Sequence, residues 1–501
     1  MAAEVVDFLV IGSGFGGSIM SMVLRRLGYT VAMVEQGRHP RFAIGESSTP
    51  FANLLLEQLA QEYDLPFLKN LSEWGLWQKH SPELPAGLKR GFTFFHHTPG
   101  EPLDFRERSS QLLVAASPND RVADTHWYRP HFDHFLVRKA VELGVLYFDQ
   151  ATIKSIAQDG SSWKLNASSP SGSRTISTAF IIDASGFSGV LSKHLSLATR
   201  SLPTMPPTCG VWAHFRDVPR LDESFSEVRE LETPYPVDDA AVHHVFRGGW
   251  VWVLKFNNGI TSAGAALSAD AGIVEADPER TWKQVLEKLP AVAEQFRSAR
   301  AMTPFYHSRQ LSFLRPEIAG SNWALLPSTT GFVDPLLSTG FALNLLGIDR
   351  LAQAVGRGTL DDYTKKTRSE LEATADLVSA LYSKMDNFDE FALLTLLYFA
   401  AMSFSETAWR LDKKQLASGF LLANNETFSR NRAQFCAVAR AGKAITRAQI
   451  ESIITPYDVA GLTDWGRNNH YPVEFCDLIS NAHKLGADAV QVDALLRKLS
   501  H

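Results

Sequence analysis

The chain has 501 residues, of which 45% are hydrophobic and 21% charged, and its net charge is -5 at pH 7. A chain of this length folds into about two or three domains, and a weak negative charge without a long basic run argues against nucleic-acid binding. The three cysteines are odd in number and not spaced for a metal. We therefore expect reduced thiols, a cytoplasmic protein and no metal site.

No targeting or membrane segment is predicted. The amino-terminal residues lack the basic region of a signal peptide and lead directly into an apolar strand. The longest apolar stretch, 391–404, is too short to span a bilayer. We expect this stretch to form a buried helix.

The first fifty residues carry the pattern of a nucleotide-binding βαβ unit. An apolar strand at 5–11 leads into a glycine-rich turn at 12–17, GSGFGG, and a helix follows over 18–27. A second apolar strand at 30–34 ends at Glu35. This order of strand, glycine turn, helix, strand and acid predicts that the chain binds a dinucleotide.

Each residue type in this turn has a physical role. Gly12 permits a tight turn, Gly14 lets the backbone approach a pyrophosphate, and Gly17 lets the helix pack closely on the strand. The free N–H groups and the dipole of the helix N-terminus favour an anion. Glu35 is placed to accept hydrogen bonds from the adenosine ribose.

The next segment contains basic residues whose roles the sequence leaves open. Arg38 and Arg41 fit contacts to phosphate or adenine and fit a solvated loop equally well. Residues 45–50, GESSTP, form an ordered loop, and the spacing predicts a helix over 51–68. Lys89 comes shortly before an alternating strand that starts at Gly91. Because most lysines are exposed to solvent, the residue type alone fits a solvated loop lysine.

Further along, helical and strand patterns alternate. A helix is predicted to 143 after Arg129, which fits either a cofactor contact or a cap of local carbonyls. Residues 147–178 predict a small antiparallel layer, and a buried strand at 179–182 then ends at Asp183. Residues 205–270 are rich in strands, and their tryptophans fit ordinary packing within a sheet.

The last pattern is a strand at 323–326 that leads into a turn rich in Gly, Pro, Ser and Thr, with a helix starting near Gly340. The rest of the chain is predicted to be helical. We expect an α/β fold with a first nucleotide-binding segment at 1–200, which contains the small β insertion. A β-rich substrate layer at 201–300, a return segment at 301–360 and a helical region at 361–501 follow.

Several of these segments together resemble flavin-dependent halogenases. They are the glycine turn with Glu35, the loop segments HPRF and GESSTP, the segment GLKRGF, the strand WVWVLK and the turn DPLLSTG. In WVWVLK, Leu254 and Lys255 replace the Ile-Pro that ends the family's motif. Leu337 stands where tryptophan halogenases carry a glutamate, so the pattern is most similar to phenol halogenases of the phloroglucinol type.

The resemblance implies a fold and a set of site residues. The fold is an FAD-binding Rossmann-like domain of the aromatic hydroxylase type, and Lys89 takes the position of the catalytic lysine. The implied FAD contacts are Gly12, Gly14, Phe15, Gly17, Glu35, Arg41, Glu46, Ser47, Arg129, Asp183, Asp334 and Gly340. The implied halide site is the backbone of Ser338, Thr339 and Gly340. The implied substrate pocket contains Phe94, Trp250, Trp252 and Leu337.

The resemblance also implies a reaction. FADH2 and O2 give a flavin hydroperoxide, chloride or bromide becomes hypohalous acid, and an electron-rich aromatic, expected to be a phenol, is halogenated. The implied partner is a separate flavin reductase, with no nucleic acid and no membrane span. Three alternatives remain open: a single-component hydroxylase that binds NAD(P)H, an isoprenoid reductase, and a flavin-binding protein without turnover, for which Lys255 is the hint.

Overall fold

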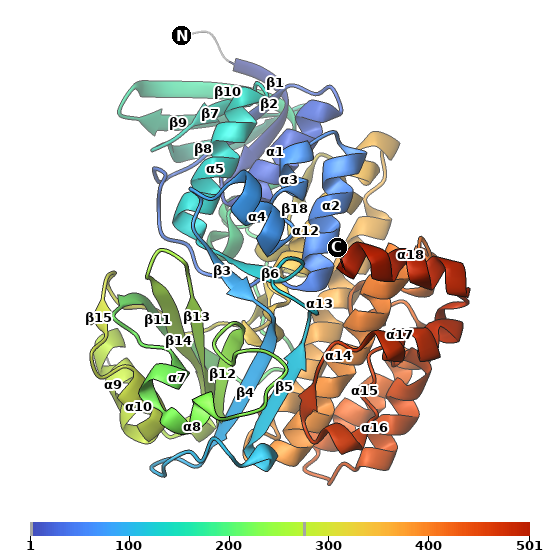
Figure 1. Ribbon diagram of the computed structural model, residues 1–501. Helices are drawn as coiled ribbons and strands as arrows, with labels where there is room; N and C mark the ends of the chain where they lie inside the picture. Colours follow the sequence, from blue (N-terminus) through green and yellow to red (C-terminus); the bar gives the residue numbers. More distant parts are fainter. Residues whose placement is uncertain (1–3, 274–276, 501) are drawn as a thin grey trace.

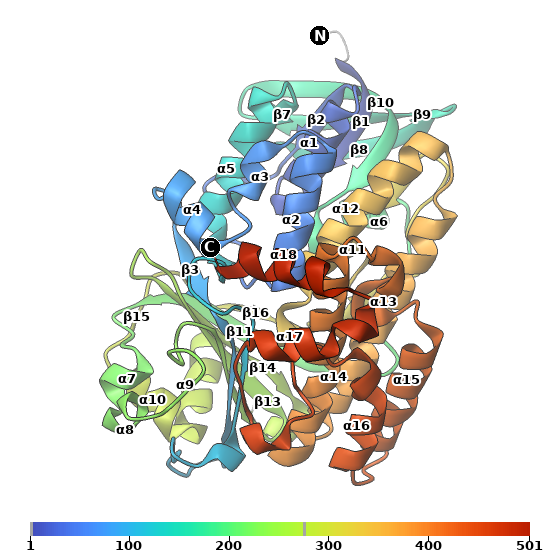
Figure 2. The ribbon, with the colours of Figure 1, turned by 45° about the vertical axis from the view of Figure 1, so that its right-hand side comes forward.

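The computed structural model describes residues 4–273 and 277–500, so residues 1–3, on which the signal-peptide prediction partly rests, lie outside the described residues. Two β-sheets lie one above the other in Figure 1, and the carboxy-terminal helices flank both of them. Figure 2 shows the helix α18 (Ala489–Ser500). It crosses between the helices of the nucleotide-binding part and those beside the lower sheet. The active-site segments lie where these parts meet.

The first sheet is the predicted nucleotide-binding sheet. Its strand order is β7 (Leu146–Phe148), β2 (Val31–Val34), β1 (Glu4–Ile11), β10 (Gly172–Asp183), β9 (Ser162–Ser169) and β8 (Thr152–Asp159), and β18 (Trp323–Leu325) also pairs with β10. The pairs β2–β1, β1–β10 and β10–β18 are parallel, whereas β8, β9 and β10 are antiparallel. The predicted βαβ unit is confirmed, and so is the antiparallel layer from residue 152 onward. Its predicted start is wrong, because β7 pairs in parallel with β2.

Helices pack on this sheet because their apolar residues face it. The helix α1 (Phe15–Arg26) is buried over its first ten residues and packs against α5 (Arg129–Glu142) and α12 (Gly340–Arg357). The predicted helix at 51–68 divides into α2 (Pro50–Glu62) and α3 (Pro66–Lys69). Pro66 explains the break, because a proline disfavours the helical conformation of the residue before it.

The second sheet draws on three parts of the chain. Its order is β15 (Arg300–Ala301), β11 (Thr208–Arg216), β14 (Thr261–Ser268), β13 (Gly249–Lys255), β12 (Ala241–Phe246), β4 (Gly91–His97), β5 (Gln111–Ala115) and β20 (His470–Tyr471), with β16 (Tyr306–Ser308) paired to β11. The strands β4 and β5 come from the first 200 residues and β20 from the helical region. The substrate layer is therefore wider than the segment 201–300.

Alternate residues of β4 pack into different cores. Phe92 and Phe94 face α14 (Phe388–Arg410), whereas Phe95 belongs to the core with α9 (Pro278–Lys288) and α10 (Pro290–Gln295). This is the period of two that a strand imposes. The helix α14 contains the apolar stretch 391–404 and is long and apolar enough to cross a membrane, but 83% of its apolar window is buried inside the fold. The prediction of a buried helix is confirmed.

The remaining elements complete the layers. Short helices are α4 (Trp74–His80), α6 (Val190–His194), α7 (Leu221–Ser224), α8 (Ser226–Arg229) and α11 (Pro327–Thr330). The carboxy-terminal helices are α13 (Asp361–Tyr382), α15 (Glu426–Arg440), α16 (Arg447–Ile454), α17 (Phe475–Asn481) and α18 (Ala489–Ser500). Two small sheets pair β17 (Phe313–Leu314) with β19 (Gly331–Phe332), and β3 (Ala86–Lys89) with β6 (Asp124–Trp127). Lys89 thus ends a strand of its own, before the strand predicted from Gly91.

An ion pair fixes α12 against the helical region. Both carboxylate oxygens of Glu370 accept hydrogen bonds from Arg350 at 2.6 and 2.8 Å, and one also accepts from the backbone N–H of Phe420 at 2.7 Å. The Glu370 side chain is 2% exposed and that of Arg350 15%. Removal of the carboxylate would leave a largely buried guanidinium without its partner.

We expect Glu370→Ala to lower the free energy of unfolding by about 3 kcal/mol, the scale on which an uncompensated buried charge destabilises a protein. Urea denaturation followed by tryptophan fluorescence measures it. Glu372→Ala, at an exposed position of the same helix, serves as the control. Equal denaturation midpoints for the two variants would show that the ion pair contributes nothing.

Candidate active site

The glycine-rich turn has the geometry that a pyrophosphate needs. Gly12 has φ +99°, and a Cβ there would lie 2.7 Å from the carbonyl oxygen of Ala184. A Cβ on Gly17 would overlap the Gly12 carbonyl oxygen. Only glycine fits these two positions. At Gly14, by contrast, the nearest atoms to a Cβ would be the Arg129 guanidinium and the Asp133 carboxylate, at 3.6 and 3.7 Å.

The helix α1 starts at this turn without a side-chain cap. Its N-cap, Gly14, has an extended backbone and no side chain that could accept a hydrogen bond from the N–H groups of the first turn. The next residue, Phe15, is buried against Trp127 and Phe341 and keeps the helix start in place. First-turn N–H groups without a protein cap are suited to an anion.

Glu35 lies at the end of β2, where its carboxylate is held ionised. It accepts hydrogen bonds from the Ser13 N–H at 3.1 Å, the Gly37 N–H at 2.8 Å and Arg41 at 3.0 Å. Burial raises the pKa of Glu35, but Arg41 and the two N–H groups outweigh burial and hold the pKa below its ordinary value. The predicted residues Glu35 and Arg41 are therefore in direct contact.

Arg129 links the turn to the GESSTP loop. It makes a bidentate pair with Asp133 at 2.7 and 2.8 Å and donates to the carbonyl oxygens of Ile44 and Gly45 at 3.0 and 2.8 Å. In the same loop, Glu46 accepts a hydrogen bond from His214 through one carboxylate oxygen at 2.8 Å. Its other carboxylate oxygen is buried with no protein partner.

The start of α12 has an unusual backbone. Leu337 and Ser338 have φ +66° and +55°, values that non-glycine residues rarely adopt and that cluster at functional sites. The N-cap Thr339 provides no side-chain cap, and the space beside Gly340 is open. Successive N–H groups in such a turn form a concavity that binds anions.

The two aspartates that were predicted to contact FAD, Asp183 and Asp334, accept hydrogen bonds from groups of the protein. Asp183 accepts from the backbone N–H groups of Ser185 and Leu191, at 2.9 and 2.8 Å. Asp334 accepts from Trp250 at 3.2 Å and from Tyr382 at 2.9 Å, and burial raises its pKa to about 6. Both carboxyl groups orient the protein at the cofactor region.

These features together test whether the residues fit FAD. The predicted contacts gather around two helix starts without side-chain caps, α1 and α12, which pack against each other. The ionised Glu35 follows β2, and the space beside Gly340 is open. One buried carboxylate oxygen of Glu46 has no protein partner. This donor and acceptor set fits FAD.

Lys89 is fully buried at the end of β3. Its ammonium nitrogen donates to the Ser48 carbonyl oxygen at 2.5 Å and to the Ser47 hydroxyl at 2.9 Å, and it lies 3.8 Å from the centre of the Phe92 ring. Burial lowers the pKa of Lys89 to about 7, while Asp124 opposes the shift. A lysine with this pKa both donates and loses a proton readily near neutral pH.

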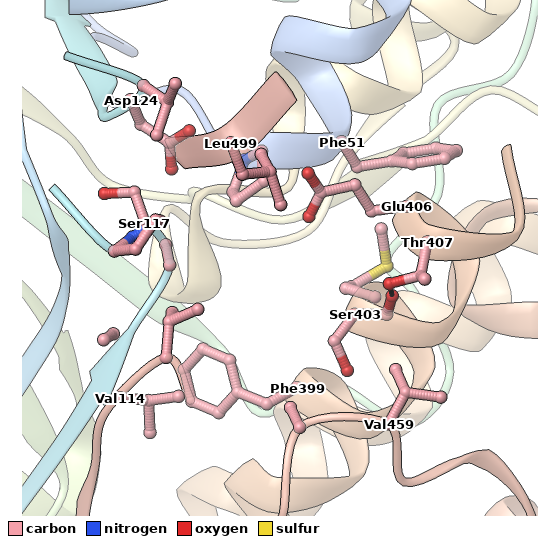
Figure 3. A pocket seen from close by; sticks show the side chains of 18 of the residues that line it. Phe51, Val114, Ser117, Asp124, Phe399, Ser403, Glu406, Thr407, Val459 and Leu499 are labelled. Carbon is pink, nitrogen blue, oxygen red and sulfur yellow. Dashed lines mark hydrogen bonds between the residues drawn. The ribbon is translucent and has the colours of Figure 1, made fainter. Parts of the chain in front are cut away.

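A cavity of about 170 Å³ is lined by Phe92, whose ring contacts Lys89, and by Asp124, its partner in the β3–β6 pair; Lys89 itself is not among the lining residues. Its walls come from the GESSTP loop, β5, α14 and the carboxy-terminal helices. Figure 3 shows Phe399 and Val114 on one side, Asp124 and Glu406 on the other, and Leu499 of α18 between them.

The chain matches the model of the tryptophan halogenase family over residues 125–392. It belongs to this family. Tetracycline 7-halogenase of Kitasatospora aureofaciens is 27% identical over 67% of this chain and 60% of its own length. Monodechloroaminopyrrolnitrin halogenase PrnC of Pseudomonas fluorescens is 25% identical over 76% of this chain and 68% of its own length. The chain thus spans about two thirds of these relatives.

Solved structures show the fold of this halogenase-family chain. The crystal structure of halogenase PltM in complex with phloroglucinol and FAD has a TM-score of 0.83 and 22% identity, and covers 92% of this chain and 99% of that one. The flavin-dependent halogenase CmlS has a TM-score of 0.60 and 19% identity, over 93% and 78%. The expected fold, an FAD-binding halogenase fold with carboxy-terminal helices, is confirmed.

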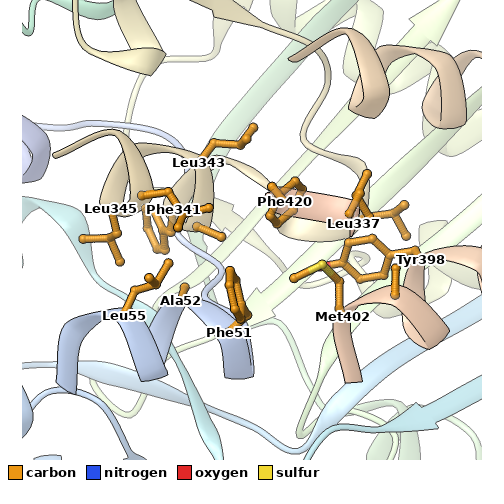
Figure 4. Close-up of a cluster of buried hydrophobic side chains, with 14 of the residues drawn as sticks. Phe51, Ala52, Leu55, Leu337, Phe341, Leu343, Leu345, Tyr398, Met402 and Phe420 are labelled. Carbon is orange, nitrogen blue, oxygen red and sulfur yellow. The ribbon is translucent and has the colours of Figure 1, made fainter. Parts of the chain in front are cut away.

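The predicted substrate-pocket residues occupy a different place from the cavity. Trp250, Trp252, Leu337 and Phe94 are all buried, and none is among the residues that line it. Leu337 belongs to the same apolar cluster as Tyr398 and Met402, which do line the cavity (Figure 4). Their role at the substrate stays a prediction. Lys255 donates to the carbonyl oxygens of Val218 and Pro219, which gives it a structural role.

Sequence reasoning missed the polar residues of the cavity. Asp124, Ser117 and Glu406 line it, although they are far apart in the sequence. For Asp124, one signal was available. It is the first residue of the segment DTHWYRP, which also contains the predicted Arg129. Aspartate is rarely buried, so an acid at the start of an aromatic strand is a candidate for a functional role.

We expect Gly14→Val to weaken FAD binding without unfolding the protein. The nearest side chains leave room for a Cβ, but a valine would enter the space in front of α1. The dissociation constant should rise more than about tenfold, because hydrogen bonds to charged groups are worth about 1.5–3 kcal/mol each. Flavin fluorescence titration measures it. Gly356→Val, at an exposed position of α12, is the control, and equal affinities would refute the assignment.

Proposed function

We propose that this protein is an FADH2-dependent halogenase that chlorinates or brominates an electron-rich aromatic compound, with a phenol as the expected substrate class. The observation that carries the proposal is the buried Lys89 in contact with Phe92, one of the aromatic residues that line the cavity. Membership of the tryptophan halogenase family supports it. By their names, the relatives act on a tetracycline and on monodechloroaminopyrrolnitrin, and PltM was solved in complex with phloroglucinol.

Different residues of the chain bind the cofactor and bind the halide. When bound, reduced FAD with O2 supplies the oxidising power that converts halide to hypohalous acid. The N–H groups at Ser338–Gly340 hold the halide at the start of α12, where the left-handed backbone supports an anion. Glu35, Arg129 and the glycine turn bind and orient the cofactor.

Lys89 then binds and orients the hypohalous acid. Its ammonium group carries three protons, two of which are directed at Ser47 and Ser48. The third can hydrogen-bond hypohalous acid and orient it toward the ring, and a deprotonated Lys89 can instead form a chloramine. Apolar side chains such as Phe92, Phe399 and Met402 line the cavity and disfavour water around the reactive acid.

We expect Lys89→Met to separate oxygen consumption from halogenation. Methionine keeps the length and the contact with Phe92 but has no donor, so the product yield should fall by about 10²–10⁴-fold. Reduced FAD should still react with oxygen, because Lys89 acts after that step. Lys89→Arg should fail as well, since arginine has another shape and stays protonated.

The assay contains a flavin reductase, NADH, FAD, bromide and a panel of phenols, with oxygen uptake and the isotope pattern of the product as readouts. Lys79→Ala removes an exposed lysine of α4 and serves as the control. Near wild-type bromination by Lys89→Met would leave Lys89 as a structural residue only. The proposal of halogenation would then lose its main support.

We also propose that electrons come from a separate flavin reductase, because the sequence uses its one recognised glycine-rich turn for FAD. The pure protein should be inactive with NADH and FAD alone and active once a reductase or chemically reduced FAD is added. NADH oxidation is followed by its absorbance. Rapid NADH oxidation by the pure protein, stimulated by an aromatic compound, would favour the single-component hydroxylase.

A further inference from the structure

Two polar side chains that line the cavity, those of Asp124 and Ser117, each have one buried oxygen atom without a hydrogen-bond partner in the protein. Asp124 is 2% exposed, and while its Oδ1 accepts a hydrogen bond from Asn53 at 2.8 Å, its Oδ2 accepts none. Ser117 is 3% exposed, and its hydroxyl has no partner. Both residues line the cavity, and Figure 3 shows the carboxyl group of Asp124 at its upper end. Buried acceptors in native proteins nearly always have a partner.

The position of Asp124 ties it to Lys89. The two residues are directly opposite each other in the β3–β6 pair, so their side chains leave the ladder on the same face. Lys89 does not form an ion pair with Asp124, because its nitrogen is held by Ser47 and Ser48. A proton acceptor at one end of the cavity therefore lies opposite a proton donor in the β3–β6 pair.

The rest of the cavity suits an aromatic ring. Phe92, Phe399 and Met402 offer flat or adaptable apolar surface in the same cavity as Asp124. A ligand that matches these walls has an aromatic body and one hydrogen-bond donor directed at the Oδ2 atom. A phenol has this combination.

We propose that Asp124 binds the hydroxyl group of a phenolic substrate and accepts its proton while the ring is halogenated. This inference rests on the proposed function. It makes Asp124 a catalytic residue in addition to Lys89, with Ser117 as a second hydrogen-bonding group for the substrate. It also defines the substrate class as aromatics with a free hydroxyl.

The proton and electron balance is as follows for a phenol and hypohalous acid. The ring carbon attacks the halogen, the halogen–oxygen bond breaks, and the hydroxyl proton moves to Asp124. The released hydroxide takes a proton from Lys89 and leaves as water. The proton on the halogenated carbon then passes to Lys89, and Asp124 returns its proton to the phenolate oxygen, so both residues are restored.

The charges around Asp124 support this role. Burial raises the pKa of Asp124 well above its ordinary value, and Lys89 opposes the shift. On the cavity walls, Glu406 and Glu73 add to the rise, whereas Arg410 opposes it. A carboxylate whose pKa lies nearer to neutral is a better general base than an ordinary aspartate.

Two probes separate the role of the hydroxyl from that of the ring. Phloroglucinol has free hydroxyl groups, and 1,3,5-trimethoxybenzene has an equally electron-rich ring without them. Asp124→Asn should lower kcat/KM for phloroglucinol by about 10²–10⁴-fold and leave the slow reaction of the ether unchanged. The deficit should shrink as pH rises, because phenolate then forms without a base. Equal losses with both probes, or no loss with phloroglucinol, would overturn the inference.

A binding measurement provides a readout other than activity. Isothermal titration of phloroglucinol into the protein should show a dissociation constant about five- to tenfold higher for Asp124→Asn, because the hydrogen bond to the Oδ2 atom of the buried carboxyl group is lost. Ser117→Ala should show a smaller rise. Asp120→Asn removes a carboxylate that is 60% exposed and is the matched control. Equal affinities of Asp124→Asn and Asp120→Asn would overturn the inference.

The design distinguishes this inference from the proposed function. A fluorescent trap for hypohalous acid, used with the wild-type protein, reduced FAD and bromide, tests the proposed function alone. If the trap gives no signal, the titration still decides whether Asp124 binds a phenol. If Asp124→Asn does not fold, the wild-type pH profile decides: a rising limb at acidic pH for phloroglucinol, absent for the ether, supports the role of Asp124, and identical limbs contradict it.

Discussion

The structure depends on a lysine ammonium group that is buried at the junction of the two sheets. An isolated ammonium ion in the protein interior is strongly destabilising unless hydrogen bonds and nearby opposite charge compensate it. Lys89 meets this condition through Ser47, Ser48 and the Phe92 ring, with Asp124 opposite. These partners come from three segments, the GESSTP loop, β4 and β6, so the position of one nitrogen atom fixes the positions of all three.

Backbone hydrogen bonds carry that constraint through the molecule. The GESSTP loop lies along one side of β6, where the Ser48 N–H donates to Thr125 and the Trp127 N–H to Glu46. On the other side, β6 pairs with β3, and the Ala86 carbonyl oxygen accepts from the Asn257 N–H beyond the end of β13. The GESSTP loop, the β3–β6 pair and the second sheet therefore form one connected network. Such a network keeps a donor aligned without help from a ligand.

The sequence predicted well whatever depends on neighbours in the chain. The glycine turn, Glu35 and the strand and helix periods around them depend on local backbone geometry, and the structure has them within a few residues. Lys89 and the Ser-Thr-Gly turn came from a resemblance to halogenases rather than from periodicity. The left-handed backbone at Leu337 and Ser338 could not be predicted, because neither residue type favours it.

By itself the sequence determined the nucleotide-binding unit, the family and the candidate lysine, since each is written in a short stretch of residues. The tertiary structure alone decided which residues surround the cavity. Asp124, Ser117 and Glu406 lie on different elements, and the chain must close its sheets and lay α14 and α18 over them before these side chains meet. It also lowered the pKa of Lys89 to about 7, because this shift results from burial. Burial is a property of the packed molecule, which no local pattern encodes.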